Sequence, residues 1–145
     1  MDRIPSVGSV MTPFPHVVHV DDSLRVARTM MVEHDVHHLP VKEGDTLVGI
    51  LTDRDLKRAL DPDLGLPTKD ELFVKDVFVR DAFVVDFAEP LDNVLEQLAA
   101  TRHVGSALIT RKGRLVGIFT LVDACRILCQ HLRAMFPNKP GDDAA

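Results

Sequence analysis

The sequence predicts a mixed α+β (α/β mixed) protein of two β-α-β-β-α repeats, packed sheet to sheet. Two observations predict it. The apolar pattern of the first half of the chain returns in the second half, 67 to 68 positions later. Within each half, short β-branched runs surround one segment in which apolar residues have helical spacing. The length of 145 residues is enough to bury a core.

The repeat keeps one register along the chain. Val7 to Thr12 matches Val74 to Val79, and further on Leu47 to Thr52 matches Leu115 to Thr120. The second offset is one residue longer, so one residue is inserted after the first helix of the second copy. Because chance seldom preserves a register over this length, we interpret the halves as copies of one unit of about 50 residues.

Each unit begins with a strand and a helix. The β-branched and aromatic runs 17–20 and 83–87 predict the first strands. Asp22 and Ser23 offer an N-cap before the first helix, and Pro90 suits the first turn of its counterpart. Helical spacing follows in both copies, at Leu24, Ala27, Met31 and His34 and again at Val94, Leu98 and Thr101.

Each unit ends with a hairpin and a second helix. Residues 39–41 and 107–109 predict strands, and Gly44-Asp45 and Lys112-Gly113 predict the turns after them. The strands 47–52 and 115–120 each run directly into a helix. We therefore expect a first repeat at 4–60, a linker at 61–70, a second repeat at 71–136 and a disordered tail at 137–145. The two repeats are expected to share one core.

Composition excludes several classes of protein. The 22 acidic and 17 basic residues give a net charge of −5, so a basic nucleic-acid-binding surface is not expected. No apolar run has the length of a membrane span, and Met1 to Pro5 does not begin a signal peptide. Cys125 and Cys129 are the two cysteines, so no disulfide framework is expected. A cytoplasmic location is the resulting expectation.

Three ordered motifs carry a resemblance to a known family. They are Val10-Met11-Thr12-Pro13, His38-Leu39-Pro40-Val41 and the run from Leu47 to Asp55, with Leu115 to Thr120 and Asp123 as the second copy of the last. Together they resemble the cystathionine-β-synthase (CBS) domain pair, or Bateman module, over roughly Ile4 to Leu132. The resemblance implies that the two repeats are related by pseudo-twofold symmetry, with two clefts for adenosine-type ligands between them. It also implies a homodimer and a regulatory rather than a catalytic role.

The residues themselves fit such a ligand. Thr52 ends a strand where a helix starts, and hydroxyl and N–H groups there favour a phosphate. Asp55 lies nearly one turn further, and its two acceptor oxygens suit the ribose diol. Thr120 and Asp123 repeat the arrangement. A threonine at such a junction is most often only an N-cap, but the repetition at matched places favours binding at one site at least.

The family's geometry implies two unequal sites. The Thr52 site has Arg54 as a cation for phosphate, whereas the Thr120 site must use His37, His38 or Arg126. Thr12 would add a hydrogen bond to the base, which Val79 cannot supply at the other site. Site one comprises Thr52, Asp55, Arg54, Val79, Ala82, Phe83, Val104, Gly105 and Ser106. Site two comprises Thr120, Asp123, Thr12, His16, Val36, His37 and His38.

Several alternatives stay open. The ligand is expected to be AMP or a related adenine nucleotide (AMP, ADP or ATP), with S-adenosylmethionine or NAD as further candidates. The module would signal to a separate, unknown protein target, with no membrane or nucleic-acid partner. The rival interpretation is a structural dimerisation module with vestigial pockets. No catalytic motif, catalytic cofactor or metal site is predicted, and Cys125 and Cys129 are interpreted as packing residues.

Overall fold

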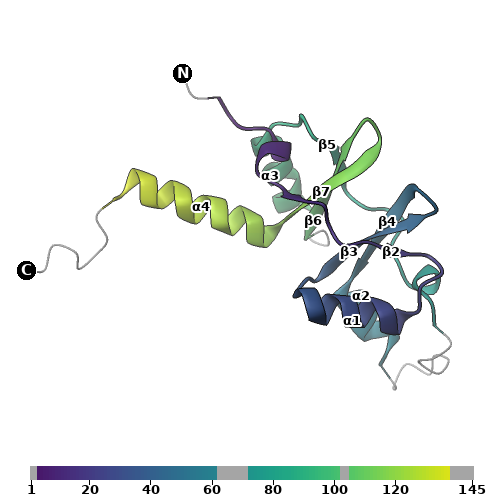
Figure 1. Ribbon diagram of the computed structural model, residues 1–145. Coiled ribbons are helices and arrows are strands. Elements are labelled where there is room, and N and C mark those ends of the chain that lie inside the picture. The colour runs from purple at the N-terminus through teal and green to yellow at the C-terminus, as the bar shows by residue number, and fades with distance from the viewer. Residues whose placement is uncertain (1–2, 62–71, 102–104, 138–145) are drawn as a thin grey trace, which may run out of the picture.

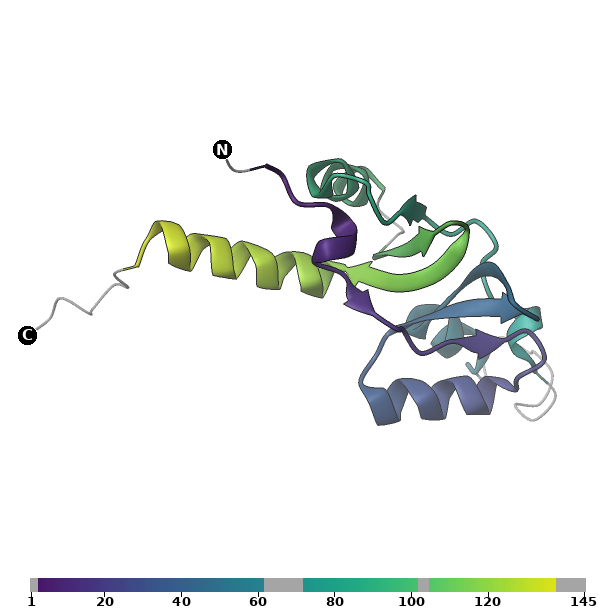
Figure 2. The same cartoon turned by 45° about the horizontal axis from the view of Figure 1, so that its top comes forward.

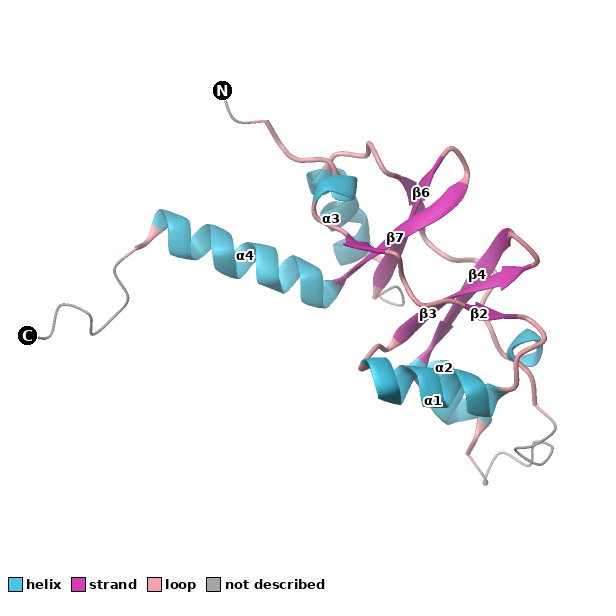
Figure 3. Cartoon of the chain, in the orientation of Figure 1, coloured by secondary structure: helices cyan, strands magenta, loops and turns pink. Residues whose placement is uncertain are grey.

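The computed structural model describes residues 3–61, 72–101 and 105–137. Two β-sheets lie between helices, with α1 and α2 outside one sheet and α3 outside the other (Figures 1 and 3). The first repeat contains β2 (Val18–His19), α1 (Leu24–His34), β3 (His38–Glu43), β4 (Thr46–Thr52) and α2 (Asp53–Ala59). The second contains β5 (Val84–Asp86), α3 (Leu91–Ala100), β6 (Ser106–Arg111), β7 (Arg114–Thr120) and α4 (Leu121–Met135). The predicted mixed α+β class and the repeated β-α-β-β-α order are confirmed.

The two repeats share their internal topology. In each, a short strand runs parallel to the next one across a helix, as β2 does to β3 and β5 to β6. An antiparallel hairpin follows, closed by Gly44 (φ 59°) in the first repeat and by Lys112 and Gly113 (φ 52° and 77°) in the second. Glycine carries such left-handed turns without a steric penalty. The two hairpins thus have the same strand register because their turns lie at matched positions.

The helix starts also follow the predicted chemistry. The hydroxyl of Ser23 accepts a hydrogen bond from the Val26 amide at 3.2 Å, which caps α1. Pro90 occupies the equivalent N-cap position of α3, where its missing N–H leaves no donor unpaired. The two crossover helices therefore start at matched positions by different means.

Each repeat contributes its first segment to the sheet of the other. The strand β1 (Thr12–Pro13) belongs to the first repeat but pairs antiparallel with β7. In return, Val79 exchanges both backbone hydrogen bonds with Ile50 of β4, each at 2.9 Å. The 3-10 helices Val7–Ser9 and Val74–Asp76, which precede these segments, follow the same exchange. The two halves are thereby interlocked.

The buried residues form two hydrophobic clusters, so the expected single core is not found among the described residues. The first cluster joins β2 to α2 with Leu72 and Val74 of the second repeat. The second cluster joins β5 to β7 with Val7 of the first repeat. The exchange of first segments explains why there are two cores and not one. Each small repeat completes its own core with apolar side chains from the other repeat.

Helix α4 extends beyond the body of the molecule (Figures 1 and 2). Its first turns pack Ala124 and Ile127 against the second core, whereas every residue from Leu128 to Pro137 is exposed. Cys125 and Cys129 are exposed free thiols. The interpretation of both as packing residues is wrong within the single chain, because the helix leaves the sheet that would have covered them. The linker and tail predictions fall almost entirely on residues 62–71 and 138–145, outside the described part of the chain.

Candidate functional site

The two predicted threonine–aspartate pairs stand where β4 and β7 end and the following helix begins. Thr52 and Thr120 are the N-cap residues of α2 and α4, and each forms a capping box with the aspartate three residues later. The threonine hydroxyl accepts from the aspartate amide, while one aspartate oxygen accepts from the threonine amide. The interpretation of both threonines as N-caps is therefore correct. The capping box uses only one oxygen, Oδ2, of each aspartate.

At the first pair, Oδ2 of Asp55 accepts from the Thr52 hydroxyl at 2.8 Å and from the Thr52 amide at 3.3 Å. No hydrogen bond or ion pair reaches Oδ1 of Asp55 from any described residue. The side chain is half-buried. One carboxylate oxygen is thus left to accept a bond from outside.

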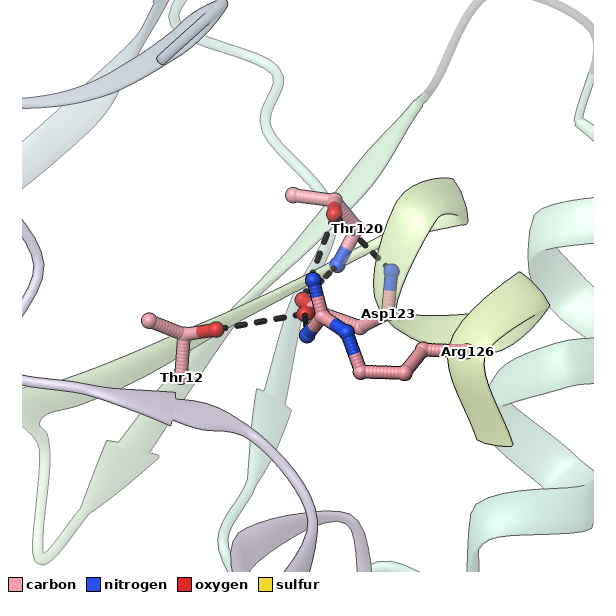
Figure 4. A network of polar contacts seen from close by, with 4 residues as sticks. All are labelled: Thr12, Thr120, Asp123 and Arg126. Atoms are coloured by element: carbon pink, nitrogen blue, oxygen red, sulfur yellow. Dashed lines mark hydrogen bonds and ion pairs between the residues drawn. The ribbon is translucent and has the colours of Figure 1, made fainter. Parts of the chain in front are cut away.

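At the second pair, both oxygens of Asp123 are engaged. Its Oδ2 accepts from the amide and hydroxyl of Thr120, at 2.9 and 3.2 Å. Its Oδ1 accepts from the hydroxyl of Thr12 and from Nη1 of Arg126, both at 3.2 Å. Figure 4 shows the three side chains converging on the carboxylate from β1, the end of β7 and α4. Asp123 is 6% exposed, and these donors compensate the burial of its charge.

Segment exchange sets two of the predicted residues, Thr12 and Val79, beside the sheet of the other repeat. Thr12 meets Asp123 directly, although the structure assigns its hydroxyl to the carboxylate rather than leaving it open for a base. Val79 lies beside β4 through its bonds to Ile50, next to the strand that ends at Thr52. The sequence offset alone gave no signal for this exchange, since a repeat that kept its own first strand would show the same offset.

His38 and Gly105 come from different repeats and lie in contact. A methyl group on Gly105 would come within 2.9 Å of Nε2 of His38. Burial lowers the pKa of His38 below its usual value, the nearby His37 lowers it further, and Asp53 opposes the shift. His38 is therefore neutral at neutral pH. In the sheet it pairs with Thr52, and Ser106 pairs with Thr120, so each lies beside the site to which it was not assigned.

The remaining predicted residues that the structure describes make no hydrogen bond or ion pair with either aspartate. His16 stacks on His34 of α1, with ring centroids 3.7 Å apart. Nδ1 of His37 lies 3.1 Å from the Asp53 carboxylate, a contact that the sequence pattern did not predict. Val36, Ala82 and Phe83 are half-buried, and Arg54 is exposed at the start of α2. Val104 lies outside the described residues.

A groove of about 640 Å³ opens between α1 and α2. Its lining includes His37, Asp53 and Lys57 but neither Thr52 nor Asp55. No group of three or more metal-ligating side chains occurs among the described residues. Within the same part of the chain, no helix is long and apolar enough to cross a membrane.

The comparisons place the chain in a family. The CBS domain family model matches residues 7–62 and 74–129, so the chain belongs to the CBS domain family as a tandem pair. A CBS domain-containing protein of Dictyostelium discoideum is 28% identical over 140 residues, covering 91% of this chain and 97% of that protein. Inosine-5'-monophosphate dehydrogenase of Thermoplasma acidophilum is 32% identical, covering 83% of this chain but 23% of that enzyme. The same module thus occurs in short proteins and as a part of enzymes.

Solved structures agree in fold. A Vibrio cholerae protein assigned to acetoin utilization (AcuB) is 25% identical with a TM-score of 0.79, covering 95% of this chain and 100% of its own. CBSX2 of Arabidopsis thaliana, solved in complex with AMP, is 26% identical with a TM-score of 0.77. The match covers 89% of this chain and 99% of CBSX2. CBS pairs of this architecture therefore include a nucleotide-binding member.

Proposed function

We propose that this chain is a regulatory module that binds an adenine nucleotide between its repeats and signals to a separate protein. The observation that carries the proposal is the carboxylate oxygen of Asp55 that no described residue engages, beside the Thr52 hydroxyl where β4 ends and α2 begins. A vicinal diol donates to just such an acceptor. AMP binding by CBSX2, which has the same architecture, supports the choice of ligand.

The charges around the first site suit a phosphate. Arg54 lies inside the motif and is exposed, so its guanidinium can turn toward a bound anion. His38 is neutral at neutral pH and offers a hydrogen bond rather than a charge. AMP is therefore the expected ligand, ahead of ADP, ATP, S-adenosylmethionine and NAD.

The module is also proposed to be a cytoplasmic homodimer. An apolar stripe on α4, made of Leu121, Cys125, Leu128, Leu132 and Met135, has the alternating four- and three-residue spacing of a helix-pairing seam. Its large side chains are exposed, for example 57% at Leu128. Exposed apolar stripes of this kind mark contact surfaces. The two exposed free thiols suit a reducing compartment.

The second candidate function is a dimerisation module with vestigial pockets. The capping boxes favour it, because they give Thr52 and Thr120 a structural role that needs no ligand. The same α4 stripe would then be the functional surface. Ligand binding separates the two functions, since a vestigial pocket binds none.

Isothermal titration calorimetry with AMP, ADP, ATP, S-adenosylmethionine and NAD tests the proposal. We expect AMP to bind, and at 100 times its Kd to stabilise the fold by about 2.7 kcal/mol in thermal unfolding. Asp55→Asn removes the free acceptor and should weaken binding at least tenfold. Asp76→Asn is the matched control, because Asp76 caps the Phe73 amide at 2.9 Å outside both predicted sites. Absence of binding by every ligand at millimolar concentration would leave the dimerisation module as the function.

A further inference from the structure

The two aspartates are equivalent in sequence but not in bonding. Asp123 has donors on both oxygens, and two of them, Thr12 and Arg126, serve no part of the capping box. The corresponding oxygen of Asp55 has no partner among the described residues. A ribose that approaches Asp123 must therefore compete with donors already in place, whereas one that approaches Asp55 need not.

The cause lies in two pairs of matched positions. Thr12 corresponds to Val79, which has no hydroxyl to donate. Arg126 corresponds to Arg58, since each lies three residues after its aspartate. Arg126 bonds to Asp123, but Arg58 is exposed and makes no ion pair with Asp55 in the described structure. The threonine in place of valine and the orientation of Arg126 each give the Asp123 carboxylate a donor. The Asp55 carboxylate receives neither donor.

We propose that Thr12 and Arg126 form a latch on Asp123, so that the module fills its sites in order. This inference rests on the nucleotide-binding function proposed above. Because of the latch, the Thr52–Asp55 site is the first to bind the nucleotide. The Thr120–Asp123 site accepts the ribose only when Thr12 and Arg126 release the carboxylate. Arg126 is suited to such release, because its side chain is 61% exposed and water can replace its ion pair.

Release also connects the site to the surface of the molecule. Thr12 is on β1 and Arg126 is on α4, so the latch ties an exchanged strand to the projecting helix (Figure 4). Arg126 is the neighbour of Cys125, which belongs to the α4 stripe. Filling the second site would therefore alter contacts of the helix proposed to meet a second copy, whereas filling the first would not.

Adenosine is the probe for the test, because it carries the ribose diol without a phosphate that could attract Arg126 directly. The second site is isolated in an Asp55→Ala background, and calorimetry measures its Kd for adenosine. Thr12→Val, which copies the residue of the first site, and Arg126→Ala should each tighten binding by about three- to tenfold, the loss of one competing hydrogen bond. Arg58→Ala is the matched control and should change the Kd less than twofold.

The outcomes separate the two proposals. If neither adenosine nor AMP binds the unmodified chain or any variant, the nucleotide-binding function is wrong and the latch falls with it. If they bind but Thr12→Val and Arg126→Ala leave the Kd unchanged or weaken it, the latch alone is wrong. The order is wrong if Asp123→Ala, rather than Asp55→Ala, removes the tighter of two binding phases in the unmodified chain. Circular dichroism confirms that each variant is folded.

Discussion

Asp55 and Asp123 each cap the first turn of a helix with one carboxylate oxygen, Oδ2. The other oxygen, Oδ1, takes no part in the cap. The capping task alone accounts for a threonine and an aspartate three residues apart. What distinguishes the two residues is the second oxygen, which is open at Asp55 and bonded twice at Asp123. A structural role and a binding role are therefore compatible in one side chain.

His38 gives a prediction at the same scale. Since burial lowers the pKa of its folded form below the unfolded value, the unfolded chain binds the proton more readily. The free energy of unfolding then has its full value above about pH 6.5. It falls as the pH drops toward the folded pKa of His38, by at most about 1.4 kcal/mol per pH unit. Urea unfolding from pH 7.5 to 5 checks this.

The control for that prediction is His38→Gln, which keeps a polar side chain but removes the titration. The variant should show a shallower loss of stability on acidification than the unmodified chain. His19→Gln changes an exposed histidine and should leave the slope as it is. Parallel curves for His38→Gln and the unmodified chain would contradict the assignment.

At the scale of elements, the exchanged segments pack so closely that they leave room only for glycine. A methyl group on Gly49 of β4 would meet the backbone carbonyl oxygen of Val79, and one on Gly117 of β7 would meet Sδ of Met11. Each glycine therefore admits the segment that the other repeat contributes. The contacts differ in kind, since the Val79 carbonyl is held by its backbone hydrogen bonds to Ile50 and a methionine side chain can move.

This difference predicts that Gly49→Ala destabilises the protein more than Gly117→Ala. For Gly49→Ala we expect a loss of about 2–4 kcal/mol, because Val79 and its two hydrogen bonds must shift. For Gly117→Ala we expect about 1–2 kcal/mol, because Met11 can change rotamer. Chemical denaturation of the two variants measures both values. Equal losses, or a larger loss at Gly117, would contradict the argument.

The sequence predicted the elements and the two capping pairs because both depend on local patterns. Turn residues such as Gly44 and the Thr-x-x-Asp spacing act over a few positions, so one sequence suffices to find them. The contact between Thr12 and Asp123 joins positions 111 residues apart, and only the packed sheets bring them together. Arg126 was predicted only as a source of charge, although its spacing of three from Asp123 on a helix already indicated an ion pair. Cys125 was placed wrongly because periodicity identifies a face of a helix but not what covers it.

At the scale of the whole molecule, the outer part of α4 packs against no other element of the described chain. Beyond Leu128 it makes no buried contact, yet its stripe of large apolar side chains continues to Met135. A protruding helix of this kind is stabilised chiefly by packing an apolar face, since helical propensity alone supplies little. The second copy in the proposed homodimer would supply that packing.

Leu132→Glu tests this arrangement. A carboxylate in the stripe opposes burial, so we expect the dimer to dissociate at least tenfold more readily, as measured by analytical ultracentrifugation. Gln130→Glu is the control, because position 130 lies about 200° around the helix from Leu132 and adds the same charge to the other face. Retention of the dimer by both variants would exclude α4 from the interface, and a monomeric unmodified chain would exclude the homodimer.

The reciprocal exchange of first segments has a consequence for a severed chain. A peptide ending at Asp61 would carry Val7 without the core that buries it, and a peptide starting at Leu72 would carry Val74 in the same condition. Neither half is complete alone, but together they contain every strand and both cores. A proteolytic nick between the repeats should therefore leave one tight non-covalent particle, and the separated halves should regain structure only when mixed.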